Sequence, residues 1–207
     1  MHTVTEVKQR KVVGILRDDR IATPKKFLTK IPRDKVREVC IDMKDGLRKA
    51  AETIFPLAKV VVDPFHIIAD SNKRMDEARR IEQGVYRRRQ VQIPKKIFLV
   101  GREKLTEEKR QKVDALLDKY PGLKSFYWAK EKIRELYRQQ SQTDATRLLE
   151  NIIFNLKSAD DAELIRWGNT LKHWREPILN HFDNIPRMAL LKAVTPRLRC
   201  SNESPMV

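Results

Sequence analysis

The stretch VCIDMKDGLRKAAETIFPLAKVVVDPFHI, residues 39–67, decides how this chain folds. Residues 36–43 (VREVCIDM) form a β-rich run containing an aspartate near its end, and residues 59–62 (KVVV) form an apolar run that leads into another aspartate. Between them, residues 45–55 carry apolar side chains at helical spacing, and Pro56 closes the run. A strand, a helix and a strand in this order predict parallel strands of a mixed sheet, joined by a right-handed crossover.

The segments on either side of this unit have different characters. Upstream, residues 4–7 and 11–16 (KVVGIL) read as two adjacent antiparallel strands of a hairpin, and residues 24–35 as a short helix with a proline-broken connection. Beyond residue 65 the pattern is amphipathic and helical. The clearest predicted helices are Thr106 to Lys119, Leu123 to Gln139, Thr143 to Leu156 and Ala162 to Phe182. The sequence therefore predicts an α/β protein in which a partial mixed sheet precedes a mainly α-helical region.

The composition narrows the class of protein. The chain has 207 residues, with 44 Lys and Arg against 28 Asp and Glu, a formal net charge of +16. Such an excess is typical of proteins that bind the phosphates of nucleic acid, although a ribosomal, RNA-binding or membrane-surface protein shows it equally. Two distant cysteines, Cys40 and Cys200, support neither a disulfide framework nor a zinc knuckle. No apolar run is long enough to span a membrane and no signal peptide is evident, so a cytoplasmic, nucleoid-associated protein is expected.

Positive charge gathers in residues 73–102, which hold ten Lys or Arg against three acids. The candidates for contact with DNA phosphates are Arg87, Arg88, Arg89, Lys95 and Lys96. The alternative is that these side chains form an ordinary solvated helix face and loop.

Two acids follow the two predicted parallel strands, Asp42 and Asp63. Carboxylates placed at the same edge of a sheet can converge on a divalent metal such as Mg²⁺, which prefers oxygen ligands together with water and substrate phosphates. An aspartate directly after a strand can also act only as a turn residue or a helix cap. The residues alone leave both interpretations open.

The block 39–67 resembles the DDE transposases of the ISL3 family of insertion sequences. The resemblance rests on four parts in order: Ile41-Asp42-Met43 at the end of a strand, a helix, Phe55-Pro56 with Ala58, and a second strand ending in Asp63-x-Phe65-His66. It extends downstream over residues 123–137, 167–174 and 178–180, so that about residues 1–184 are covered.

This resemblance implies an RNase H-like fold in which three acids, Asp, Asp and Glu, hold two Mg²⁺ or Mn²⁺ ions. The family's second acid corresponds to Asp42, which is therefore the expected catalytic residue and metal ligand. Asp63 is expected to support the metal site from its edge. His66, placed at an apolar strand end, is more typical of a packed histidine.

The chain departs from the family's pattern at both ends. The family's first acid lies in an IDE-like motif upstream of the hairpin, and Glu6 has no suitable position to replace it. The third acid is expected just after Asn184, in a TNG-x-x-EG-like segment, and Glu203 does not lie in such a segment. Codons that encode residues 188–199 (MALLKAVTPRLR) can also encode NGFTEGCHTKIK when they are read one base out of register. That peptide is a version of the expected segment. A frameshift near Arg187 is therefore expected, with a naturally divergent C-terminus as the alternative.

These features divide the chain into residues 1–67, a partial catalytic core, residues 68–184, a helical extension of the same domain, and residues 185–207, an out-of-frame tail. The predicted function is DNA transposition by descent, in a chain that lacks two of three catalytic acids. The alternatives are a non-catalytic protein that binds DNA or inhibits an intact transposase, and a decayed reading frame without function. The expected partners are insertion-sequence ends and an intact transposase, and no membrane.

Overall fold

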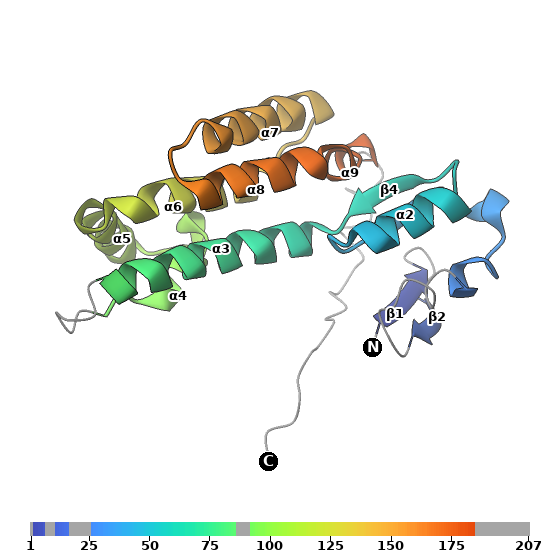
Figure 1. Ribbon diagram of the computed structural model, residues 1–207, viewed down its shortest axis with the longest axis horizontal. Coiled ribbons are helices and arrows are strands. Elements are labelled where there is room, and N and C mark those ends of the chain that lie inside the picture. The colour runs from blue at the N-terminus through green and yellow to red at the C-terminus, as the bar shows by residue number, and fades with distance from the viewer. Residues whose placement is uncertain (1, 7–10, 17–25, 86–91, 185–207) are drawn as a thin grey trace, which may run out of the picture.

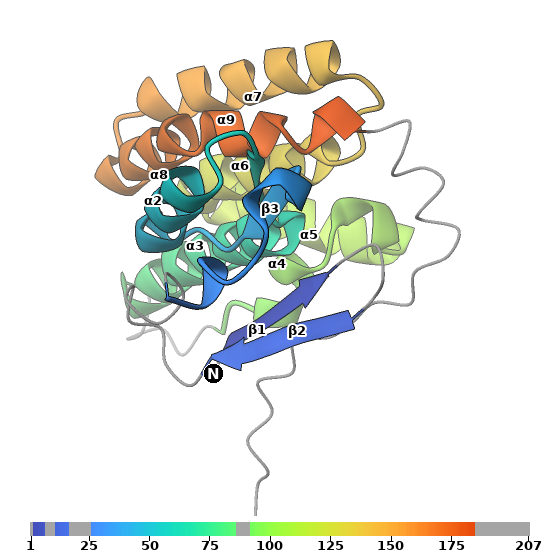
Figure 2. The ribbon, with the colours of Figure 1, turned by 90° about the vertical axis from the view of Figure 1, so that its right-hand side faces the viewer.

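The computed structural model describes residues 2–6, 11–16, 26–85 and 92–184. The first two strands form the predicted hairpin: β1 (His2–Glu6) pairs antiparallel with β2 (Lys11–Leu16), with an irregular register between Val4 and Thr5. Within the described residues, this hairpin is a sheet of its own and is not hydrogen-bonded to the other two strands. Figure 2 shows it apart from β3.

The second sheet is the strand, helix and strand unit that the sequence predicts. β3 (Glu38–Ile41) pairs in parallel with β4 (Lys59–Val62), in a register that places Ile41 beside Val62. The crossover helix α2 (Asp45–Ile54) buries Ala50, Ala51 and Ile54. It ends at Ile54. The Phe55 N–H still bonds to the Ala51 carbonyl, but the following Pro56 has no N–H to continue the helix. A short 3-10 turn, η1 (Arg33–Lys35), precedes β3.

The long helix α3 (Pro64–Val85) begins directly after β4 and extends away from the sheet (Figure 1). Pro64 occupies its first position, where an N–H would have no partner within the helix. The helix is continuous across residues 67 and 68, so the proposed boundary between a catalytic core and a helical extension falls inside it.

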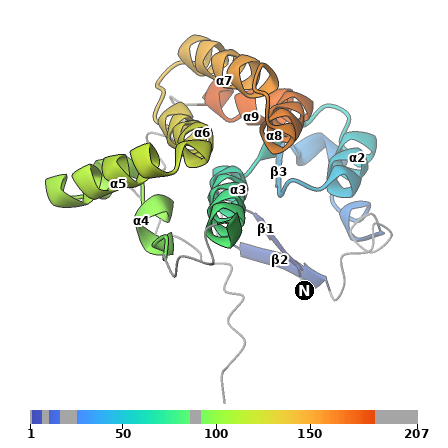
Figure 3. The ribbon, with the colours of Figure 1, turned by 60° about the vertical axis from the view of Figure 1, so that its left-hand side comes forward.

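Further helices cover α3, as the amphipathic pattern predicts. They are α4 (Lys95–Leu99), α5 (Glu107–Lys119), α6 (Lys124–Leu136), α7 (Gln142–Lys157), α8 (Ala162–His173) and α9 (Arg175–Leu179), with 3-10 turns η3 (Arg102–Lys104), η4 (Pro121–Leu123) and η5 (Phe182–Asn184). In Figure 3, which views α3 nearly end-on, α6 and α8 lie above it and α7 lies above both. The Ser141 and Asp161 side chains cap the N-termini of α7 and α8.

One hydrophobic core joins the sheet to the helices. Its buried members include Val62 of β4, Ile67 of α3, Ile133 of α6 and Trp167 of α8. The Asn180 side-chain amide, just after α9, donates to the Val60 carbonyl at 2.9 Å, so the end of the helical region is fastened to β4. The small parallel sheet and the helices are therefore parts of one packed α/β unit.

The prediction of one helix from Ala162 to Phe182 is wrong, because the chain breaks between α8 and α9 at Trp174. The cause is Pro177, which has no N–H to donate to the carbonyl four residues earlier, that of His173. Nη1 of Arg48 on α2 donates to this carbonyl instead, at 3.0 Å. A contact over 125 residues of sequence thus satisfies the acceptor that the proline leaves open.

Among the described helices, none is both long and apolar enough to cross a membrane.

Candidate functional site

The parallel register brings Asp42 and Asp63 to the same edge of the β3–β4 sheet. Each follows the last residue of its strand, and those last residues, Ile41 and Val62, are register partners. The Asp63 N–H donates to the Ile41 carbonyl at 3.0 Å, which extends the ladder to the point where the two carboxylates begin. The sequence predicts both acids at one edge of the sheet, and both lie at that edge in the structure.

The Asp42 carboxylate presents an oxygen without a partner. Its Oδ1 is buried and accepts no hydrogen bond from the described part of the chain, while Oδ2 lies 3.6 Å from the Lys44 ammonium. A buried carboxylate oxygen that no donor satisfies is costly unless a ligand completes it. The arrangement therefore suits a cation bound at Oδ1.

Asp63 has a structural role of its own. Its Oδ1 accepts the Phe65 N–H at 2.9 Å, which caps the first turn of α3. This capping is the alternative that the sequence left open for an aspartate after a strand, and it occupies one of the two carboxylate oxygens. A ligand role for Asp63 remains a prediction that concerns the other oxygen.

His66 was expected at a strand end, but it lies in the first turn of α3. Its N–H donates to the Asp63 carbonyl at 3.0 Å, and its ring meets the Phe65 ring edge to face at 5.5 Å between centroids. The misplacement follows from Pro64, which begins a helix rather than extending a strand.

Tyr137, which follows α6, was missed by the sequence reasoning. Its ring stacks on Phe182 at 5.9 Å between centroids, and its hydroxyl is buried without a partner among the described residues. Burial raises the pKa of the Tyr137 hydroxyl above its ordinary value, and the charges of Asp63 and Cys40 add to the effect. No sequence signal could have placed it there, because the proximity arises from packing between residues more than 70 positions apart.

The described residues contain no group of three or more His, Cys, Asp or Glu side chains arranged to hold a metal ion. The edge of the sheet therefore offers a pair of acids, of which Asp42 has the open oxygen, and a complete site for two ions requires more carboxylates.

The predicted DNA-binding residues fall into two groups. Arg87, Arg88 and Arg89 lie outside the described residues. Lys95 and Lys96 form the first turn of α4 and are exposed. The Lys95 ammonium lies 3.2 Å from the Asp76 carboxylate on α3, so it belongs to a charge cluster in the C-terminal half of α3 and not to the acid pair.

Comparison with known proteins agrees with the pattern of residues 39–67. A family model described as "Transposase", for DDE transposases of the ISL3 type, matches residues 1–189. A curated protein described as "Transposase for insertion sequence element IS1001", from Bordetella parapertussis, is 22% identical over 166 residues. The alignment covers 76% of this chain and 41% of that protein, so the chain spans about two-fifths of the relative's length. No solved structure matches.

Proposed function

This chain belongs to the ISL3 family of DDE transposases, and we propose that it supplies Asp42 to a divalent-metal site for phosphoryl transfer at insertion-sequence ends. The observation that carries the proposal is the buried Asp42 Oδ1 without a partner at the edge of the parallel sheet. The parallel pair with its crossover α2 supports a partial RNase H-like core in residues 1–67, with residues 68–184 as its helical extension.

When bound, Mg²⁺ or Mn²⁺ would activate a water or a DNA 3′-hydroxyl and stabilise the departing oxygen. The residues of this chain would hold the cation and orient the groups around it. Asp42 Oδ1 would hold the cation. Asp63 fixes the sheet edge through its Oδ1 cap on α3, so Oδ2 is the oxygen that it could offer to the cation. The Lys44 ammonium, 3.6 Å from Asp42 Oδ2, would balance part of the negative charge of this carboxylate.

We infer that the chain does not cut DNA by itself. Two ions need about three carboxylates to offset their charge, and the described residues bring two acids together. The family match ends at residue 189, close to Arg187, which supports the proposal of a frameshift there. Sequencing the DNA that encodes residues 185–207 and the DNA downstream of it tests this: an EG-like motif one base out of frame is expected, and its absence in every frame contradicts the proposal.

A metal-binding experiment tests the role of Asp42. Titration of the chain with Mn²⁺, followed by electron paramagnetic resonance, should show weak binding that Asp42→Asn abolishes. Asp160→Asn is the matched control, because Asp160 is an exposed acid in the loop between α7 and α8, far along the chain from the sheet edge. Equal binding by both variants would show that the cation does not use Asp42.

A nicking assay on a plasmid that carries insertion-sequence ends tests the inferred deficiency. No strand cleavage is expected with Mg²⁺ or Mn²⁺. Cleavage that disappears in Asp42→Ala would contradict the deficiency, because the chain would then supply the other carboxylates from elsewhere in its sequence.

A second candidate function is occupation of insertion-sequence ends without cutting, alone or in an oligomer with an intact transposase. The observation that favours it is the net charge of +16, which suits attraction to the DNA backbone whether or not a metal is bound. A gel-shift assay that compares insertion-sequence ends with random duplex tests it. Equal affinity for both would leave only phosphate attraction and would contradict end recognition.

A further inference from the structure

A cluster of charges lies in the C-terminal half of α3, and the acid pair lies beyond the helix's other end. Asp76 is buried, with 7% of its surface exposed. Its carboxylate lies 2.8 Å from Arg79 Nε, 3.3 Å from Arg80 Nε and 3.2 Å from Lys95 Nζ. One negative charge therefore holds three positive charges, and the cluster keeps an excess of two positive charges.

The carboxylate orients the cations rather than neutralising them. Burial by itself would raise the pKa of Asp76, but hydrogen bonds from Arg79 and Lys95 lower it below the ordinary value, so the group stays ionised. Arg79 is largely covered, and its Nη1 also donates to the Ile93 carbonyl at 3.2 Å. The Arg80 and Lys95 side chains are 67% and 52% exposed, so they remain accessible to a ligand.

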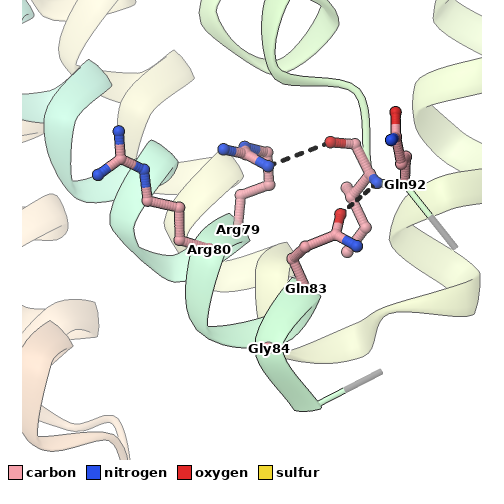
Figure 4. A pocket seen from close by; sticks show the side chains of 6 residues that line it. Arg79, Arg80, Gln83, Gly84 and Gln92 are labelled. Atoms are coloured by element: carbon pink, nitrogen blue, oxygen red, sulfur yellow. Dashed lines mark hydrogen bonds between the residues drawn. The ribbon is translucent and has the colours of Figure 1, made fainter. Parts of the chain in front are cut away.

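A hollow of about 500 Å³ adjoins the cluster (Figure 4). Its lining contains two arginines, two glutamines, a glycine and an isoleucine, and no acid: Arg79, Arg80, Gln83, Gly84, Gln92 and Ile93. Figure 4 shows Arg79 and Gln83 reaching from α3 to the backbone beside Gln92. A Cβ added at Gly84 would meet no atom within 4 Å, so the helix backbone lies open to an approaching group.

We propose that this hollow binds a backbone phosphate of duplex DNA, with Arg80 of its lining and Lys95 of the adjoining cluster as the cationic contacts. The proposal deepens the proposed function and rests on it for the choice of DNA. A guanidinium held by a buried carboxylate is already oriented, so less side-chain entropy is lost when a phosphate oxygen binds. Such contacts attract DNA of any sequence, because phosphates carry no base information.

Gly84 allows a test that removes no existing contact. Gly84→Glu, Gly84→Lys and Gly84→Ala place a negative, a positive and a neutral side chain in the same open space. At low salt, fluorescence anisotropy with a labelled duplex of arbitrary sequence should show about threefold weaker binding for Glu and about threefold tighter binding for Lys, as for a unit charge about 6 Å from a phosphate in water. The Ala variant should match the wild type, and circular dichroism confirms that all three fold.

The salt dependence gives a second readout. The double variant Arg80→Ala and Lys95→Ala should lower the slope of log affinity against log salt by about 1 to 2. The matched control replaces Lys109 and Lys112, two exposed lysines of α5 that do not line the hollow, and should change the slope less.

The outcomes separate this proposal from the function on which it rests. If salt-dependent duplex binding is unchanged across the Gly84 series, the hollow does not bind a DNA phosphate, and the proposal of DNA binding by the chain stands. Failure of the wild type to bind duplex overturns both. A parallel titration with inorganic phosphate distinguishes the source of the ligand: binding of phosphate that Gly84→Glu abolishes, with duplex binding unaffected, overturns the assignment to DNA.

Discussion

Replacing Arg48 with methionine should destabilise the fold through the break between α8 and α9. The guanidinium donates to the His173 carbonyl at 3.0 Å and lies 5.7 Å from the centre of the Trp174 ring. A hydrogen bond from a charged donor contributes about 1.5 kcal/mol, and a partly exposed cation–π contact contributes about 0.5 kcal/mol. The Glu52 pair is half exposed and adds little. Arg48→Met is therefore expected to lower the free energy of unfolding by about 2 kcal/mol.

A double-mutant cycle with Pro177→Ala tests the cause. An alanine at position 177 restores the N–H that can donate to the His173 carbonyl, so the carbonyl no longer depends on Arg48. In this background Arg48→Met should cost about 1 kcal/mol less, measured by urea unfolding. Arg147→Met is the control, because Arg147 is 79% exposed and its ion pair spans 3.9 Å. Equal costs of Arg48→Met in both backgrounds would refute the link between the proline and the arginine.

Three further changes test the packing and its dependence on pH. Gly168→Ala should destabilise the contact between α8 and α7 by about 1 to 3 kcal/mol, because its Cβ would lie 2.8 Å from Lys157 Cγ and 3.2 Å from the Lys157 N atom. Lys130→Met should cost about 3 kcal/mol in urea unfolding, since the buried ammonium donates to the Phe98 carbonyl at 2.6 Å. Burial raises the pKa of Tyr127 to about 12. The contribution of Tyr127 to the free energy of unfolding is therefore complete below the pKa of the unfolded chain, about 10, and is lost as the pH rises from there. Tyr127→Phe should show a smaller loss of stability over that pH range.

Local patterns predicted the part of the fold that depends on neighbours in sequence. The apolar runs of residues 36–43 and 59–62 and the helix between them determine both strands, and hence the placement of Asp42 and Asp63 at one edge. The cap on α3 was one of the two interpretations that the sequence left open for Asp63, because an aspartate followed by proline is also typical of a helix start. The position of His66 differs from the prediction because the apolar run into Phe65 is also typical of a continuing strand.

The remaining features depend on contacts between distant segments. Arg48 reaches the carbonyl that Pro177 leaves open only because α2 packs beside the end of α8, and the periodicity of residues 162–182 gave no sign of that contact. Tyr137 comes close to Asp63 because η5 stacks on its ring. Propensity and periodicity act over one or two helical turns, so they could not identify either interaction.

The continuity of α3 sets the relation between the acid pair and the basic hollow. Asp63 caps its first turn and Gly84 lies in its last, a separation of about 30 Å at about 1.5 Å per residue. A duplex that ran alongside α3 and reached both ends would be held at phosphates about nine base pairs apart, at about 3.4 Å per base pair. This spacing is close to one turn of the duplex, so both contacts would meet the same face of the DNA. Because one helix packed into one core carries both ends, this spacing is fixed by the fold and not by a linker. A phosphate contact at the hollow would then restrict which phosphate lies beside Asp42, even though neither contact reads the base sequence.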